Sequence, residues 1–234
     1  MHSSRLRAFV ELVANCAVAA AAIAIIWRVV ISPVMSPTAP KRSSPVEDVR
    51  ARNISVTVDQ SAQRGSVEAS LVLIEFSDYE CPFCGRHARE TFSQIDKEFI
   101  ERQEVQYVFR NYPLEIHKHA TSAAEAAECA GVQGKYWEMH RALFARQAEL
   151  AESVWKREGS AIGLDMPSFE ECLAGVMSEK IRADMAEGRR LGVKATPTFF
   201  IGRKEAEGNV RLVSRISGAH PFEVFRDALQ DAKQ

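Results

Sequence analysis

The sequence predicts an α/β domain whose core is interrupted by a block of helices and preceded by an apolar segment. Apolar runs of strand length lie at residues 71–76, 105–109 and 197–201. Between the second and the third run, residues 119–190 are rich in Ala, Glu and Arg and helical in pattern. Residues 12–31 are almost wholly apolar. At 234 residues the chain is long enough for one good-sized domain with its own core.

The N-terminal apolar run has about the length that a helix needs to cross a bilayer. Arg5 and Arg7 precede it, which favours an N-terminus held in the cytoplasm. We expect residues 1–31 to be an uncleaved signal anchor. A cleaved signal peptide is the alternative, although the run exceeds the usual ~7–15 apolar residues and no Ala-x-Ala site follows it. Residues 32–50 are rich in Pro and Ser and predict an extended spacer, with the folded, exported domain over 51–234.

The charge is unevenly spread. Of 30 basic and 31 acidic residues, five basic residues and one acidic residue fall within residues 1–44, so the body of the chain is mildly acidic. Such a surface offers no counter-ions for phosphates, and we expect no nucleic-acid partner.

The domain is expected to begin with a short strand at residues 54–58, where apolar and polar residues alternate. The continuous apolar run 71–76 is typical of a central strand that is buried on both faces. Proline suits the first helical position, where its missing N–H would go unpaired anyway, so a helix is expected from Pro82 to about Glu101. Residues 105–109 predict the next strand.

The helical block is predicted to be an insertion over about residues 115–190. After it come a strand at 197–201, a hairpin marked by Gly208 and an amphipathic helix over 222–232.

Cys81 and Cys84 directly follow a predicted buried strand and open a predicted helix. At the N-cap, free backbone N–H groups and the helix dipole favour a negative charge, which lowers the pKa of the Cys81 thiol. A spacing of two residues keeps both sulfurs within bonding distance. This arrangement predicts a thiol–disulfide redox centre.

The cysteine pair has three other interpretations. A zinc half-site would take His87 as a third ligand, but no second ligand pair follows at zinc-finger spacing. Haem attachment needs His directly after the second cysteine, where Gly85 stands. A structural disulfide at a helix start would be easily reduced.

A second signal lies far along the chain, at Pro197 within the segment Ala-Thr-Pro-Thr-Phe-Phe. A proline at the head of a strand is tolerated if its peptide bond is cis and its missing N–H leaves an edge open. We expect a cis-proline loop that faces the active cysteine and pairs its backbone with an extended substrate. A plain trans-proline that begins a strand is the alternative.

Three segments, residues 76–84, 131–140 and 191–201, together resemble the DsbA-like thioredoxin family over about residues 52–232. The resemblance implies a thioredoxin fold with an inserted helical domain, and catalysis of disulfide exchange outside the cytoplasm without a cofactor or metal. It also implies exported protein thiols as substrates and a membrane partner that resets the redox centre.

On that resemblance Cys81 is the nucleophile, Cys84 the resolving thiol and Pro197 the cis-proline. Glu75, six residues before Cys81, matches the buried acid that relays a proton to the resolving thiol. Burial would raise the pKa of its carboxyl. A carboxylate on a sheet edge is the alternative.

Pro82, Phe83 and Thr196 are expected on the substrate-binding surface. The strongest oxidants of the family carry His between the cysteines, where this chain has Phe83. The departure leaves the direction of electron flow open, and Thr196, which also precedes the proline in isomerase relatives, does not decide it.

Of the five cysteines, two form the redox pair and Cys16 falls in the apolar segment, so two others remain. In an oxidising compartment Cys129 and Cys172 are expected to form a structural disulfide; two buried free thiols are the alternative. We expect three histidines to cap or pack helices: His117, His119 and His140. We expect three aromatic residues in the core: Tyr136, Trp137 and Phe144.

The sequence thus predicts a membrane-tethered, extracytoplasmic thiol–disulfide oxidoreductase that forms or exchanges disulfides in exported proteins. Within the enzyme class the alternative is a disulfide isomerase or reductase, for example one that serves cytochrome maturation. From another class comes a non-catalytic protein that binds metal or thiols.

Overall fold

The computed structural model describes residues 44–58, 61–175, 177–205 and 208–234. The predicted signal anchor and Cys16 lie outside these ranges. Within them, no helix is long and apolar enough to span a bilayer.

A seven-stranded sheet forms the core, in the order β1-β7-β6-β4-β5-β3, with β2 paired to another part of β7. Strands β4 and β5 are parallel, and every other pair is antiparallel. The strands are β1 (Val46–Asp48), β2 (Ser55–Val56), β3 (Ala62–Arg64), β4 (Leu71–Ser77), β5 (Val105–Asn111), β6 (Thr198–Lys204) and β7 (Val210–Ser217).

Strand β4 lies at the centre and all seven of its residues are buried, as its unbroken apolar run predicts. Successive side chains point to opposite faces. Leu71 and Leu73 therefore join the core on one face of the sheet, and Val72 and Ile74 join the core on the other. Glu75 follows this alternation, so its carboxyl lies on the face of Leu73.

Two strands were not predicted, and one corrects the predicted spacer. Strand β1 falls inside the range 32–50, yet it pairs with β7 from Val46 opposite Ile216 to Asp48 opposite Ser214. Strand β3 pairs with β5. Three-residue strands at the two edges of a sheet are held by backbone hydrogen bonds, which leave no periodic apolar pattern in the sequence.

The predicted helix after Cys81 is confirmed, and it runs from Pro82 to Ile100. It is not uniformly α-helical: between α2 (Pro82–Arg86) and α3 (Phe92–Ile95) lies a π-helical segment, His87–Thr91, and a second one follows at Asp96–Ile100. Such π segments are rare and occur frequently at functional sites.

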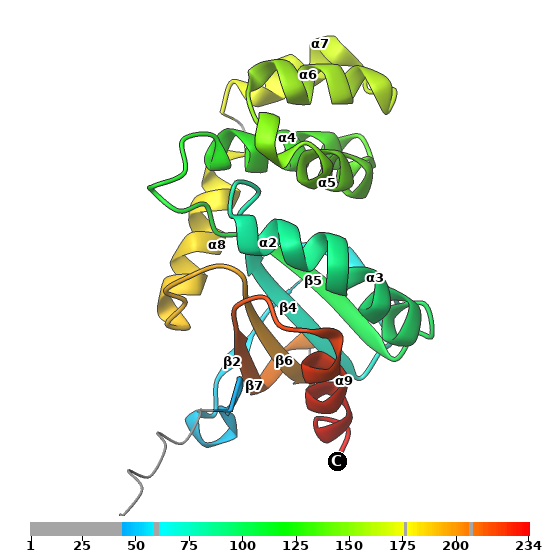
Figure 1. Cartoon of the computed structure of the whole chain (residues 1–234), viewed down its shortest axis with the longest axis vertical. Helices are drawn as coiled ribbons and strands as arrows, with labels where there is room; N and C mark the ends of the chain where they lie inside the picture. Colours follow the sequence, from blue (N-terminus) through cyan, green and yellow to red (C-terminus); the bar gives the residue numbers. More distant parts are fainter. Residues whose placement is uncertain (1–43, 59–60, 176, 206–207) are drawn as a thin grey trace, which may run out of the picture. The chain divides into compact units, whose positions relative to one another are not determined.

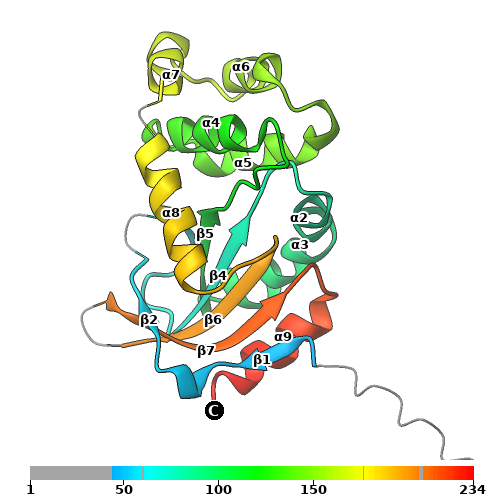
Figure 2. The same ribbon diagram turned by 90° about the vertical axis from the view of Figure 1, so that its left-hand side faces the viewer.

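The helical block lies between β5 and β6 and comprises α4 (Ala120–Val132), α5 (Tyr136–Ala145), α6 (Glu152–Ala161), α7 (Met166–Leu173) and α8 (Ser178–Arg190). Helices α4 to α7 stack beyond one end of the sheet, and α8 returns along one face of it (Figures 1 and 2). The opposite face is covered by α2, α3 and the C-terminal helix α9 (Phe222–Asp231) (Figure 2). The fold is a thioredoxin-like α/β fold with a helical insertion.

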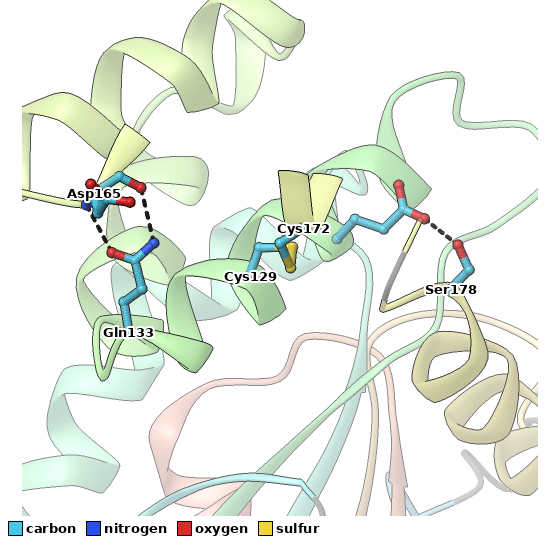
Figure 3. The surroundings of a disulfide bond; sticks show 6 residues. Cys129, Gln133, Asp165, Cys172 and Ser178 are labelled. Atoms are coloured by element: carbon cyan, nitrogen blue, oxygen red, sulfur yellow. Dashed lines mark hydrogen bonds between the residues drawn. A yellow bond between two sulfur atoms is a disulfide. The ribbon is translucent and has the colours of Figure 1, made fainter. Parts of the chain in front are cut away.

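A disulfide joins Cys129 of α4 to Cys172 of α7, with the Cα atoms 5.7 Å apart (Figure 3). Polar contacts on either side of it also tie α4 to the start of α7 and to the start of α8. The Gln133 side chain exchanges two hydrogen bonds with the backbone of Asp165, at 2.8 and 3.2 Å. The Ser178 hydroxyl donates to Glu125 Oε1 at 2.7 Å. The disulfide therefore reinforces the packing of the insertion.

Replacing Cys129 and Cys172 together with alanine is expected to lower the free energy of unfolding by at most about 4 kcal/mol. The cysteines are separated by 43 residues, and opening a loop of that size restores this much chain entropy to the unfolded state. Urea denaturation of the variant and the parent would measure the loss. In a variant lacking the other three cysteines, thiol titration in denaturant should find no free thiol, and two titratable thiols would contradict the pairing.

Candidate active site

Cys81 is the N-cap residue of α2, with extended backbone angles (φ −70°, ψ 120°), and Pro82 takes the first helical position. The Cys81 carbonyl accepts the first helical hydrogen bond from Gly85 N–H at 3.1 Å. The thiol thus sits at the positive end of the helix, where unpaired N–H groups favour a thiolate.

The distant proline segment lies directly against this cysteine. The Thr196–Pro197 peptide bond is cis, as predicted. The Cys81 thiol donates a hydrogen bond to the Thr196 carbonyl oxygen at 3.3 Å, across 115 residues of sequence. The fold therefore brings together the residues that the sequence predicts on either side of the helical insertion.

The two thiols have opposite acidities. A hydrogen bond from the Cys84 thiol is the largest cause that lowers the pKa of Cys81 to about 5, and burial opposes it. Thr196 and the N–H groups of Phe83 and Cys84 lower the pKa further. Burial raises the pKa of Cys84 well above its usual value, and the interaction with Cys81 raises it further. Cys81 is therefore the thiolate at neutral pH and Cys84 the protonated partner.

Glu75 is buried, at 2% exposure, as its apolar flanks predict. Burial raises the pKa of its carboxyl to about 7, although the hydrogen bond from Tyr107 opposes the rise. Tyr107 O–H donates a short hydrogen bond to Glu75 Oε2. A charge on Glu75 raises the pKa of Cys84, and the Ser77 hydroxyl lowers it. The carboxyl is thus coupled to the Cys84 thiol and titrates near neutral pH.

Pro82 and Phe83 lie on the outer surface of the redox centre. Pro82 is exposed, and the Phe83 ring is 56% exposed with the Arg86 guanidinium 5.3 Å from its centroid. Thr196 is 5% exposed and reaches the site through its carbonyl group.

The inserted domain supplies one residue that no sequence pattern indicates. Gln147 Nε2 donates to the carbonyl oxygens of Tyr79 and Cys81 at 2.7 and 2.8 Å. A side chain at Gly85 would collide with Gln147, so glycine is required for this approach. Gln147 therefore fixes the turn that carries Cys81 from a segment 66 residues away.

Gln147→Ala is expected to lower the free energy of unfolding of the reduced protein by about 1–2 kcal/mol, because two carbonyl groups lose a donor. Urea denaturation would measure the change. Gln94→Ala is the matched control, since Gln94 is exposed and bonds only to Glu90 of its own helix; its effect should stay within about 0.5 kcal/mol. Equal losses in the two variants would contradict the proposed link.

Other predicted side chains have structural contacts. His140 is buried and packs its ring against Phe109 and Phe144, while its Nδ1 lies 3.0 Å from the Tyr79 hydroxyl. His117 Nδ1 lies 2.7 Å from Asp78 Oδ2, which fixes the loop before α4. Among the residues that the structure describes, no group of three or more His, Cys, Asp or Glu side chains is arranged to hold a metal ion.

The family model described as Thioredoxin matches residues 57–214. The chain belongs to the thioredoxin family. Among solved structures it is similar to a thioredoxin-like oxidoreductase from Silicibacter pomeroyi DSS-3, with 28% identity, a TM-score of 0.61 and coverage of 74% of this chain and 92% of that chain. It is also similar to alpha-DsbA1 from Wolbachia pipientis, at 20% identity and a TM-score of 0.66, with coverage of 76% and 92%.

The curated proteins that the chain matches are much longer than the chain, and the match covers only part of each. A Na⁺/H⁺ antiporter NhaA 1 from Mycobacterium sp. (strain KMS) is 40% identical over 149 residues, which are 62% of this chain and 24% of the antiporter. The chain spans about a quarter of the length of the curated relatives that it matches.

Proposed function

We propose that this thioredoxin-family protein is an extracytoplasmic oxidase that passes the Cys81–Cys84 disulfide to the thiols of exported proteins. The observation that carries the proposal is the opposite acidity of the two thiols. A thiolate that is stable at neutral pH favours the reduced form of the centre, so the disulfide is readily given away.

The proposed reaction starts from the oxidised centre. A substrate thiolate attacks Cys81 Sγ, the Cys81–Cys84 bond breaks, and Cys84 leaves as a thiolate that takes a proton from the Glu75 carboxylic acid. A second substrate thiolate then attacks the substrate sulfur of the mixed disulfide, and Cys81 leaves as a stable thiolate. The substrate loses two electrons and the cysteine pair gains them, so a membrane partner must reoxidise the pair.

Substrate is proposed to lie across the Thr196–Pro197 segment and the exposed Phe83 ring. The backbone just before β6 faces Cys81 through the Thr196 carbonyl group. Pro197 has no N–H, so this backbone does not pair with another strand of the protein there. An extended peptide fits such an edge.

Two features support a location outside the cytoplasm, tethered to the membrane. The apolar segment at residues 12–31 predicts export and anchoring. The Cys129–Cys172 disulfide is typical of an oxidising compartment.

The reduction potential tests the direction of electron flow. A pKa of about 5 at Cys81, against about 7 in thioredoxin, favours the reduced form by about 2.3 kcal/mol at pH 7, or about 50 mV. Equilibration with glutathione is therefore expected to give a potential of about −220 mV, with a higher value for Phe83→His, whose imidazole would stabilise the thiolate. A potential at or below about −270 mV would identify a reductant and favour the alternative reductase or isomerase function.

A non-catalytic thiol protein is the remaining alternative. It predicts that purified protein keeps both active-site thiols reduced and does not accelerate the oxidation of a reduced test protein. The oxidase predicts a reducible Cys81–Cys84 bond and acceleration that is lost in Cys81→Ala.

A further inference from the structure

The active-site helix carries a buried imidazole that the reaction above does not use. His87 follows Cys84 by three residues and its side chain is 1% exposed. The ring packs between Phe199 of β6 and Phe225 of α9, with centroid distances of 4.5 and 5.2 Å. Neither ring nitrogen has a hydrogen-bond partner among the described residues. Burying a polar group without a hydrogen bond destabilises the fold, so the retention of this imidazole needs a physical explanation.

The group that His87 faces is the buried acid. His87 Nε2 lies 3.4 Å from Glu75 Oε2 without forming a hydrogen bond. The remaining polar groups around the pair come from several elements. They are Ser77 of β4, Tyr107 of β5, the two active-site thiols, and His140 of α5, whose pKa responds to a charge on His87.

We propose that His87 is a positioning residue for Glu75. The His87 Nε2–H donates a hydrogen bond to the Glu75 carboxylate when the acid is ionised, and this hydrogen bond is released when the acid is protonated. The inference rests on the proposed role of Glu75 as proton donor to Cys84. When Cys84 leaves as a thiolate it takes the Glu75 proton, and the negative charge moves to the carboxylate. Tyr107 O–H and His87 Nε2–H then both donate to it, and no bond to hydrogen on His87 breaks.

A neutral imidazole suits this task better than other side chains. Burial lowers the pKa of His87 to about 3, so the ring is neutral at pH 7. A permanent cation at this distance would hold Glu75 in its ionised form and remove its proton from the reaction. A hydrocarbon ring would leave the carboxylate with one donor fewer in a dry site. The neutral N–H supports the ionised acid without excluding the protonated one.

His87→Phe tests the inference, because phenylalanine keeps a ring between Phe199 and Phe225 and removes both nitrogens. The midpoint of the Glu75 titration, followed in the reduced protein by the infrared carbonyl band of the protonated acid, is expected to rise from about 7 by about one pH unit. The band is assigned by its loss in Glu75→Gln. In the Glu75→Gln background, His87→Phe should leave the pH dependence of Cys84 alkylation unchanged, since the effect runs through Glu75.

An unchanged Glu75 midpoint in His87→Phe would overturn the inference. So would a shift in the pH dependence of Cys84 alkylation that His87→Phe causes equally in the wild type and in the Glu75→Gln background. If His87→Phe does not fold, nitrogen NMR of the wild type decides instead. The expected result is the Nε2–H tautomer, with its shift following the Glu75 midpoint, and an Nδ1–H tautomer at all pH values would overturn the inference. These measurements need no substrate, so a protein that couples His87 to Glu75 but oxidises no substrate would refute the proposed function alone.

Discussion

Replacing Cys84 with alanine is expected to turn the protein from a catalyst into a trap for its substrates. The Cys81 thiolate can still attack the disulfide of an already oxidised substrate, which is the reverse of the last proposed step, to form a mixed disulfide and release one substrate thiol. No second thiol is then present to resolve that bond, so turnover is abolished and covalent complexes accumulate. Non-reducing electrophoresis should show complexes that disappear with reductant.

The same variant tests the electrostatics of the site. Since the hydrogen bond from Cys84 is the largest cause of the lowered pKa of Cys81, that pKa is expected to rise from about 5 in Cys84→Ala. The ultraviolet absorbance of the thiolate, followed against pH, measures it. The double variant Cys81→Ala/Cys84→Ala is the control and should show neither complexes nor a thiolate signal. An unchanged pKa would show that the helix N-terminus, and not Cys84, holds the charge on Cys81.

Glu75→Gln is expected to stabilise the reduced protein at alkaline pH. The pKa of Glu75 is raised from 4.5 to about 7 in the folded state, so folding favours its protonated form. Stability from this group is fully present below pH 4.5 and is lost as pH rises through 7. The loss amounts to about 3 kcal/mol at pH 8, and a neutral amide avoids it.

The measurement is the difference in free energy of unfolding between Glu75→Gln and wild type, taken by urea denaturation from pH 4 to pH 8. The difference removes the contributions of all other titrating groups. Tyr107→Phe is the companion variant, because it removes the hydrogen bond that lowers the pKa of Glu75. The carboxyl should then remain protonated beyond pH 7, so the pH-dependent fall in the free energy of unfolding should extend to higher pH than in the wild type. A difference that does not vary with pH would contradict the burial-shifted carboxyl.

Local features were predictable because each depends on a short stretch of chain. The unbroken apolar run of β4, the proline at the helix start and the two cysteines that flank it define the redox centre within fourteen positions, residues 71–84. The burial of Glu75 followed from its apolar neighbours. Strand β1 was missed because its three residues are held by backbone bonds to β7, and such bonds leave no pattern in the sequence.

By itself the sequence determined which chemistry this protein carries: a thiol pair at a helix N-terminus after a buried strand, and a proline segment suited to cover it. The tertiary structure decided how that chemistry is adjusted. Gln147 contacts the carbonyl of Cys81, and Tyr107 and His87 meet at Glu75, only because the sheet and the helical insertion close around the site. Helix starts and strands arise from neighbours in sequence, whereas the pKa of a buried group depends on whatever the fold packs against it.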